Sequence, residues 1–232
     1  MWNGKKKAIT FSFDDGVAQD IKLIEIMNRY GLKGTFNLNS GKFGGGDTTK
    51  GLDGRTVVRR LMTAEEVVKL YEGHEVAVHT LTHPNLTQQT DEEVIRQVDE
   101  DRKNLEKLFG YPIVGMAYPC GGVNNDERVA ELIRKNTPIG YSRTITSTFT
   151  FDLQKDNLLQ FNPTLHYMNP KTEEIVEQFL AMETDEPQLL YIWGHSYELD
   201  FDDTRWERFE NLCKMLSGKE DIFYGTNKEV LL

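Results

Sequence analysis

Strand-like and helix-like segments alternate along the whole chain, and this alternation constrains the fold more than any other feature of the sequence. Short runs rich in apolar and aromatic residues predict strands at 8–13, 34–38, 75–78, 113–118, 189–193 and 222–224, with a β-rich, irregular stretch at 141–165. Helical periodicity predicts helices at 21–30, after capping boxes at 63–66 and 90–93, and at 126–135, 172–182 and 206–216. This order predicts parallel β-α-β units, and about seven strands suit a barrel or a doubly wound sheet.

No linker and no shift in composition divides the chain, so residues 1–232 are expected to form one domain. Residues 41–54 contain six glycines among polar residues and are expected to be a loop. The chain carries 27 Lys and Arg against 37 Asp and Glu, and its net charge of −10 argues against nucleic acid or an anionic membrane as a partner.

Two cysteines are too few for a disulfide framework and fit a reducing compartment. No apolar run is long enough for a transmembrane helix, and the lysines at 5–7 are followed by no apolar signal core. The given chain is therefore expected to be cytoplasmic.

Polar residues with catalytic chemistry follow the predicted strands. Asp14 and Asp15 follow the first strand, His79 and His83 the third, and His195 comes after the apolar run at 189–193. Active sites of parallel α/β folds lie at the carboxyl ends of the strands, so these side chains are expected to meet there.

His79 and His83 are four residues apart, a spacing that places two side chains on one face of a helical turn. With one carboxylate they form a set that suits catalytic Zn²⁺ or another divalent ion. Asp15 can supply that carboxylate while Asp14 stays free as a general base. Two unrelated loop histidines and an Asp-Gly turn are the alternative explanations.

His195 has a reference pKa near neutrality, which suits a general acid, although a hydrogen-bonded core histidine explains the pattern equally well. His166 follows a strand-like stretch and is expected to line the same cleft. Glu198 follows His195 closely enough to touch the site.

Four segments together resemble the polysaccharide deacetylases of the NodB-homology type, carbohydrate esterase family 4. They are Thr10–Gly16 (TFSFDDG), His79–Pro84 (HTLTHP), Met116–Gly121 (MAYPCG) and the Leu-rich strand that ends at His195. The segments occur in the family's order and at roughly its spacing. The resemblance implies a distorted (β/α) barrel, often of seven strands, and metal-dependent removal of N-acetyl groups from an N-acetylated sugar or oligosaccharide.

Carried over position by position, the resemblance makes Asp14 the general base toward a metal-bound water and His195 the general acid. Asp15, His79 and His83 become the ligands of one divalent metal. Zn²⁺ is expected, although Co²⁺, Ni²⁺, Mn²⁺ and Fe²⁺ also suit such ligands.

The third motif departs from the family, which commonly has an arginine where this chain has Ala117. Arg143, at the end of another predicted strand, can supply the guanidinium that orients Asp14, unless it is a surface residue. The usual aromatic residue of this motif is replaced by Cys120, which is expected to serve packing. Aromatic and imidazole side chains expected to bind the substrate are those of Tyr118, His166 and Trp193.

Two other functions remain open. The first is a hydrolase of the same fold with another substrate, such as an O-acetyl-xylan esterase or a cyclic-imide amidohydrolase. The second is a non-catalytic carbohydrate-binding relative. The joint presence of three ligands, a base and an acid argues against the second, since a decayed site is expected to lose at least one of them.

Overall fold

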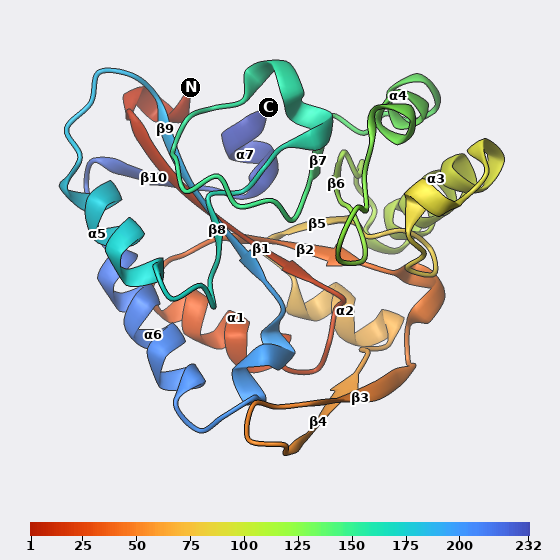
Figure 1. Cartoon of the computed structure of the whole chain (residues 1–232), viewed down its shortest axis with the longest axis horizontal. Helices are drawn as coiled ribbons and strands as arrows, with labels where there is room; N and C mark the ends of the chain where they lie inside the picture. Colours follow the sequence, from red (N-terminus) through yellow and green to blue (C-terminus); the bar gives the residue numbers. More distant parts are fainter.

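Strand β1 (Lys7–Asp14) lies at the centre of the sheet in the computed structural model, which describes all 232 residues (Figure 1). Strand β9 (Gln188–Gly194) pairs with it along one side. The other side is shared, because β10 (Ile222–Tyr224) pairs with the first half of β1 and β2 (Gly34–Leu38) with the second half. All these pairings are parallel, as the alternation of strands and helices predicted.

The main path of the sheet contains seven strands in the order β7-β6-β5-β2-β1-β9-β8, and β10 is attached to β1. The remaining members are β5 (Glu75–Val78), β6 (Gly115–Ala117), β7 (Tyr141–Arg143) and β8 (Leu165–His166). The segment that leads into β8 also reaches β7, because the Phe161 N–H donates to Ser142 of that edge strand and its C=O accepts from Thr144, the residue after the strand. The expected distorted seven-stranded (β/α) barrel is therefore confirmed.

Seven α-helices connect or follow the strands: α1 (Asp20–Arg29), α2 (Ala64–Leu70), α3 (Asp91–Phe109), α4 (Glu127–Asn136), α5 (Thr172–Ala181), α6 (Arg205–Leu216) and α7 (Asn227–Leu231). Short 3₁₀ helices occupy Trp2–Gly4, Ser40–Lys42, Leu86–Gln88, Lys155–Gln160 and Ser196–Asp200. The final helix α7 was not predicted from the sequence. None of the helices combines the length and the apolar character needed to cross a bilayer.

The two predicted capping boxes differ in the structure. Thr63 and Glu66 exchange both hydrogen bonds at the start of α2, as expected. At the start of α3 the Thr90 hydroxyl accepts from the Glu93 N–H, but the Glu93 carboxylate binds Arg96 instead. The second box is therefore only half formed, because an ion pair one turn further along the helix competes for the carboxylate.

Alternation along β1 determines what lies on each face of the sheet. Phe11 and Phe13 pack on Phe209 of α6, with ring centroids 6.4 and 5.9 Å apart, in a cluster of 41 buried apolar residues. Thr10, Ser12 and Asp14 point to the opposite face, since successive side chains of a strand alternate. The strand thus carries polar side chains along the inner face of the barrel and ends in a carboxylate.

The glycine-rich segment 41–54 is not only a loop, and that prediction was wrong. It contains β3 (Gly46–Lys50), which pairs antiparallel with β4 (Thr56–Arg60). The hairpin is mostly exposed, so it lacks the apolar alternation by which a half-buried strand is recognised. Gly46 is required there, because a Cβ at this position would lie 2.8 Å from the Arg59 carbonyl oxygen.

Candidate active site

The carboxyl ends of β1, β5, β7 and β9 bring the predicted site residues together. Asp14 and Asp15 lie at the end of β1, and His79 follows β5 directly. His79 Nε2 lies 3.8 Å from Asp14 Oδ2 and 3.8 Å from Asp15 Oδ1, and His195 Nε2 lies 3.9 Å from Asp14 Oδ2. The sheet therefore gathers at one edge residues that are far apart in the sequence.

Asp15, His79 and His83 form a cluster whose ligand atoms all lie within 4.8 Å of one another. His83 Nε2 is 3.6 Å from Asp15 Oδ1, and His79 Nε2 is 3.8 Å from the same oxygen. Ligands of a tetrahedral zinc ion, bound at about 2.1 Å, are about 3.4 Å apart. The spacing of these three donors therefore fits a divalent metal ion.

The hydrogen bonding of the two histidines also suits a metal. His79 Nδ1 lies 2.9 Å from the carbonyl oxygen of Ala117, so it carries the proton and leaves the Nε2 lone pair toward Asp15. Burial, together with the neighbouring His79, lowers the pKa of His83 to about 4. His83 is thus neutral at physiological pH, and neutral imidazole is the form that binds metals.

The loop that carries the histidines is not a helical turn, and the helical explanation of their spacing was wrong. Thr80 and His83 have φ values of 69° and 65°, in the left-handed region that a helix excludes. Two buried side chains hold this loop: Asn39 donates to the carbonyl oxygens of His79 and Thr80, and the Asp101 carboxylate accepts from the His79 N–H. Sequence reasoning missed both Asn39 and Asp101, since neither belongs to a recognisable motif.

Asp14 is bound by a buried arginine. Arg143 Nη2 lies 2.6 Å from each of the two carboxylate oxygens of Asp14, and Asn37 Nδ2 donates to one of them at 2.8 Å. Burial raises the pKa of Asp14, but its neighbours, above all the charged and hydrogen-bonded Arg143, outweigh this effect and hold the pKa below its ordinary value. Asp14 is therefore ionised at neutral pH.

The register between β6 and β7 explains how Arg143 reaches this carboxylate. Ala117 pairs directly with Arg143 across the two strands, and paired residues of neighbouring strands face the same side of a sheet. The small side chain at 117 leaves this side open to the guanidinium. Arg143 is fully buried and lies 4.4 Å from the centre of the Trp193 ring, so it is not a surface residue.

Glu198, three residues further along the chain, contacts the side of the His195 ring that faces away from Asp14. Glu198 Oε1 is 3.5 Å from His195 Nδ1, and Glu198 Oε2 accepts from the His195 N–H at 3.1 Å. Burial lowers the pKa of His195, but the Glu198 carboxylate outweighs this and raises it to about 9. Burial raises the pKa of Glu198, but hydrogen bonds with His166 and His195 outweigh this and keep it well below its usual range.

His166 completes a second cluster with His195 and Glu198, and this cluster differs chemically from the first. His166 Nδ1 accepts a hydrogen bond from the Met168 N–H, so Nε2 carries the proton and donates it to Glu198 Oε2 at 3.1 Å. Its Nε2 lone pair is therefore absent, and these residues suit a hydrogen-bonded chain better than a metal.

The structure corrects the assignment of Tyr118 to the substrate. Its side chain is 1% exposed in the apolar core, and its hydroxyl donates to the Leu159 carbonyl oxygen at 2.7 Å. Tyr118 comes directly after Ala117, the last residue of β6, and its side chain points to the opposite face from the site. Trp193 lies beside the site but is only 8% exposed, and His166 is partly exposed at its rim.

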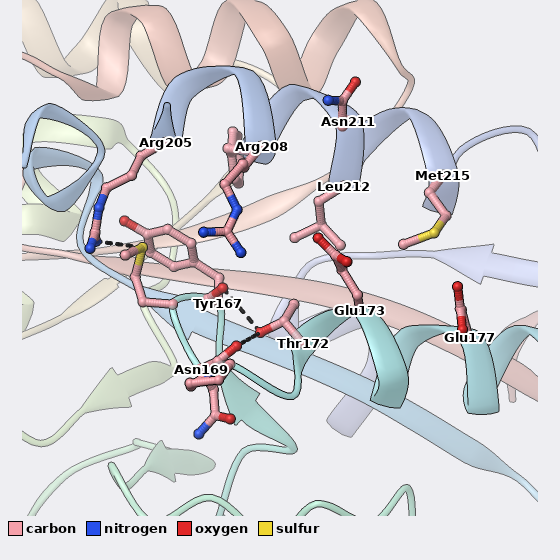
Figure 2. A pocket seen from close by; sticks show the side chains of 13 residues that line it. Tyr167, Asn169, Thr172, Glu173, Glu177, Arg205, Arg208, Asn211, Leu212 and Met215 are labelled. Atoms are coloured by element: carbon pink, nitrogen blue, oxygen red, sulfur yellow. Dashed lines mark hydrogen bonds between the residues drawn. The ribbon is translucent and has the colours of Figure 1, made fainter. Parts of the chain in front are cut away.

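A separate cavity of about 250 Å³ lies between α5 and α6 (Figure 2). Figure 2 shows Arg208 and Leu212 of α6 facing Glu173 of α5 across it. None of the proposed metal ligands lines this cavity. Tyr167 is its link to the site, because the hydroxyl of this residue donates to the His195 carbonyl oxygen at 2.8 Å.

Comparison with known proteins places this site in a family. The family model of polysaccharide deacetylase matches residues 2–136. The peptidoglycan-N-acetylglucosamine deacetylase PgdA of Listeria monocytogenes is 31% identical over 129 residues, which cover 55% of this chain and 24% of that protein. The chain thus matches about a quarter of the length of this curated relative.

Solved structures show the same fold. The peptidoglycan deacetylase PdaC of Bacillus subtilis superposes with a TM-score of 0.56 at 20% identity, over 97% of this chain and 90% of that chain. The family 4 carbohydrate esterase of Streptomyces lividans, solved with acetate, gives 0.57 at 16% identity, over 96% and 93%. Since the family model covers more than half of the 232 residues, this chain belongs to the polysaccharide deacetylase family.

Proposed function

We propose that this protein is a metal-dependent hydrolase that removes the acetyl group from the nitrogen of an N-acetylated sugar or oligosaccharide. The observation that carries the proposal is the position of the Asp15, His79 and His83 donors beside the Asp14–His195 pair. The name of the Listeria relative, a peptidoglycan-N-acetylglucosamine deacetylase, supports an N-acetylated sugar as the substrate class.

The donor set fits a divalent ion, for which Zn²⁺ is our expectation and Co²⁺, Ni²⁺, Mn²⁺ and Fe²⁺ are alternatives. Asp15 Oδ1, His79 Nε2 and His83 Nε2 would hold it. When bound, such an ion supplies a Lewis acid that polarises the acetyl carbonyl and makes a neighbouring water more acidic.

Asp14 is proposed as the general base. It is ionised, and Arg143 and Asn37 fix its orientation, so one oxygen can accept the proton of the attacking water. In this role Arg143 does not contact the substrate, because its guanidinium is fully buried against Asp14 and Trp193.

His195 is proposed as the general acid. Its pKa of about 9 keeps the imidazole protonated at neutral pH, so it can donate to the amide nitrogen as the C–N bond breaks. Its Nε2 lies 3.9 Å from Asp14 Oδ2, so the acid and the base flank one small space. One group is held ionised and the other protonated, which is the pattern of an acid–base pair.

Metal content and acetate release test this function together. Protein purified without added metal is expected to hold about one divalent ion per chain and to release acetate from N-acetylglucosamine oligomers. His79→Ala is expected to lose both, whereas His74→Gln, at the other end of β5, is expected to keep the metal.

Acetylated xylan and small cyclic imides serve as comparison substrates in the same assay. Turnover of either one in preference to the N-acetylglucosamine oligomers would replace the proposed substrate. A wild-type protein that takes up no divalent ion on titration would overturn the mechanism itself.

A further inference from the structure

Cys120 contacts the imidazole of His83 on the side away from Asp15. Its Sγ lies 3.7 Å from His83 Nδ1 and 3.5 Å from the His83 carbonyl oxygen. On the other side of the ring, His83 Nε2 faces Asp15 Oδ1 at 3.6 Å. The thiol therefore does more than the packing that the sequence predicted, because it touches the second nitrogen of a proposed metal ligand.

One arrangement of protons makes both contacts of Sγ separate hydrogen bonds. The thiol hydrogen is donated to the His83 carbonyl oxygen, so the sulfur has lone pairs left for His83 Nδ1. In this arrangement Nδ1 is the protonated nitrogen, and Nε2 presents its lone pair toward Asp15. This is the tautomer that a metal ligated through Nε2 requires.

One segment orients both histidines. The Ala117 carbonyl oxygen holds Nδ1 of His79 at 2.9 Å, and Cys120, three residues further on, holds Nδ1 of His83. The turn after β6 is fixed by Asn124, whose side-chain amide donates to the carbonyl oxygens of three successive residues, 118–120. Cys120 itself has a φ of 70°, a left-handed conformation that places its side chain against the histidine loop.

We propose that Cys120 is a positioning residue for the metal site, which holds the His83 ring in the Nδ1–H tautomer with Nε2 directed at Asp15. The inference deepens the proposed function and rests on it for its purpose. The tautomer itself can be measured in the metal-free protein.

Long-range ¹H–¹⁵N NMR of the histidine rings, at neutral pH and without metal, tests the arrangement. His83 is expected to be Nδ1–H in the wild type and to shift toward a mixture of tautomers in Cys120→Ala. Cys120→Ser, whose hydroxyl can accept and donate in the same way, is expected to restore the Nδ1–H form in part. His79 provides the internal control, because its Nδ1 proton is held by the Ala117 carbonyl oxygen in every variant.

Co²⁺ titration of the same proteins measures the consequence. Loss of an outer hydrogen-bond partner typically weakens metal binding by about 10-fold or more, and we expect this of Cys120→Ala. The matched control is Cys213→Ala, which removes the other thiol from the buried core and is expected to leave Co²⁺ affinity unchanged. Thermal unfolding establishes that each variant is folded.

An unchanged His83 tautomer in Cys120→Ala would overturn the inference, as would an equal loss of Co²⁺ affinity in both cysteine variants. The two proposals can fail separately. A wild type that binds neither Co²⁺ nor Zn²⁺ contradicts the metal-dependent function, and the NMR result still decides whether Cys120 holds His83.

Discussion

Arg143 and Asp14 form a fully buried ion pair across the barrel, with Arg143 Nη2 2.6 Å from both carboxylate oxygens. The two residues are 129 positions apart and come from β7 and β1. Both side chains are at most 2% exposed, so water screens neither charge. Removing one partner of such a pair leaves the other charged and buried, which is far costlier than replacing both.

Arg143→Met is expected to lower the free energy of unfolding by about 3 kcal/mol or more and to reduce kcat at least about 100-fold, because Asp14 loses both its counter-charge and its orientation. The double variant Asp14→Asn/Arg143→Met is expected to recover most of the stability and none of the activity. Urea denaturation and acetate release measure the two effects separately.

Arg96→Met is the matched control for this prediction, because Arg96 forms exposed ion pairs on α3. Such pairs contribute about 1 kcal/mol at most. A loss in Arg143→Met no larger than that of Arg96→Met would contradict the role of Arg143.

Glu198→Gln is expected to move the alkaline limit of activity to lower pH. The His195 pKa of about 9 is raised against burial mainly by the Glu198 carboxylate, and the proposed general acid can donate only while it is protonated. Wild-type kcat/KM should therefore fall as the pH rises through about 9, and the variant should lose activity at least about one pH unit earlier. The pH profiles of wild type and variant measure the shift.

Glu207→Gln controls for the loss of one negative charge, since Glu207 is exposed on α6. Its profile should match that of the wild type. If Glu198→Gln has the same alkaline limit as this control, His195 is not tuned by Glu198.

Asp20 lies buried beside the site and should make stability fall as the pH rises. Burial raises its pKa to about 7, although hydrogen bonds with Ser196 and Tyr71 lower it in part. Between about pH 4 and 7 the folded state therefore keeps a proton on Asp20. The unfolded state, in which the pKa has the ordinary value of 3.8, has already released that proton. Between pH 5 and 8 this linkage should cost roughly 3 kcal/mol of unfolding free energy.

Asp20→Asn is expected to remove this slope, because an amide keeps hydrogen-bond partners for both hydroxyls and has no proton to lose. Guanidinium denaturation at pH 5 and pH 8 gives the slope for each protein. Equal slopes in wild type and variant would show that Asp20 does not retain its proton in the folded state.

Gly194 allows Tyr167 to pack beneath the segment that carries His195. A Cβ at 194 would lie 2.1 Å from the Tyr167 ring, whose hydroxyl holds the His195 carbonyl oxygen. Gly194→Ala is therefore expected to destabilise the fold by about 1–3 kcal/mol and to lower activity as well. At Gly121 a Cβ meets nothing within 4 Å, so the same substitution there should change unfolding free energy by about 0.5 kcal/mol or less.

The sequence by itself determined the alternation of elements and the chemistry at the strand ends. Strands 34–38 and 75–78 were predicted with their observed bounds, because buried strands carry a local apolar signal. The exposed hairpin at 46–60 carries no such signal and was missed. The candidate metal ligands, base and acid were all recognised, since each follows a strand, whereas the supporting Asp101 was missed.

Only the tertiary structure decided which side chains touch. The sequence offered Arg143 as one candidate partner for Asp14, but the β6–β7 register places it opposite Ala117 and on the inner face. The tertiary structure also decided that Tyr118, one residue after Ala117, points into the core. It likewise placed the Cys120 thiol in contact with the His83 ring. Periodicity is a property of neighbouring residues, whereas these contacts depend on register and on the curvature of the sheet, which bring distant segments together.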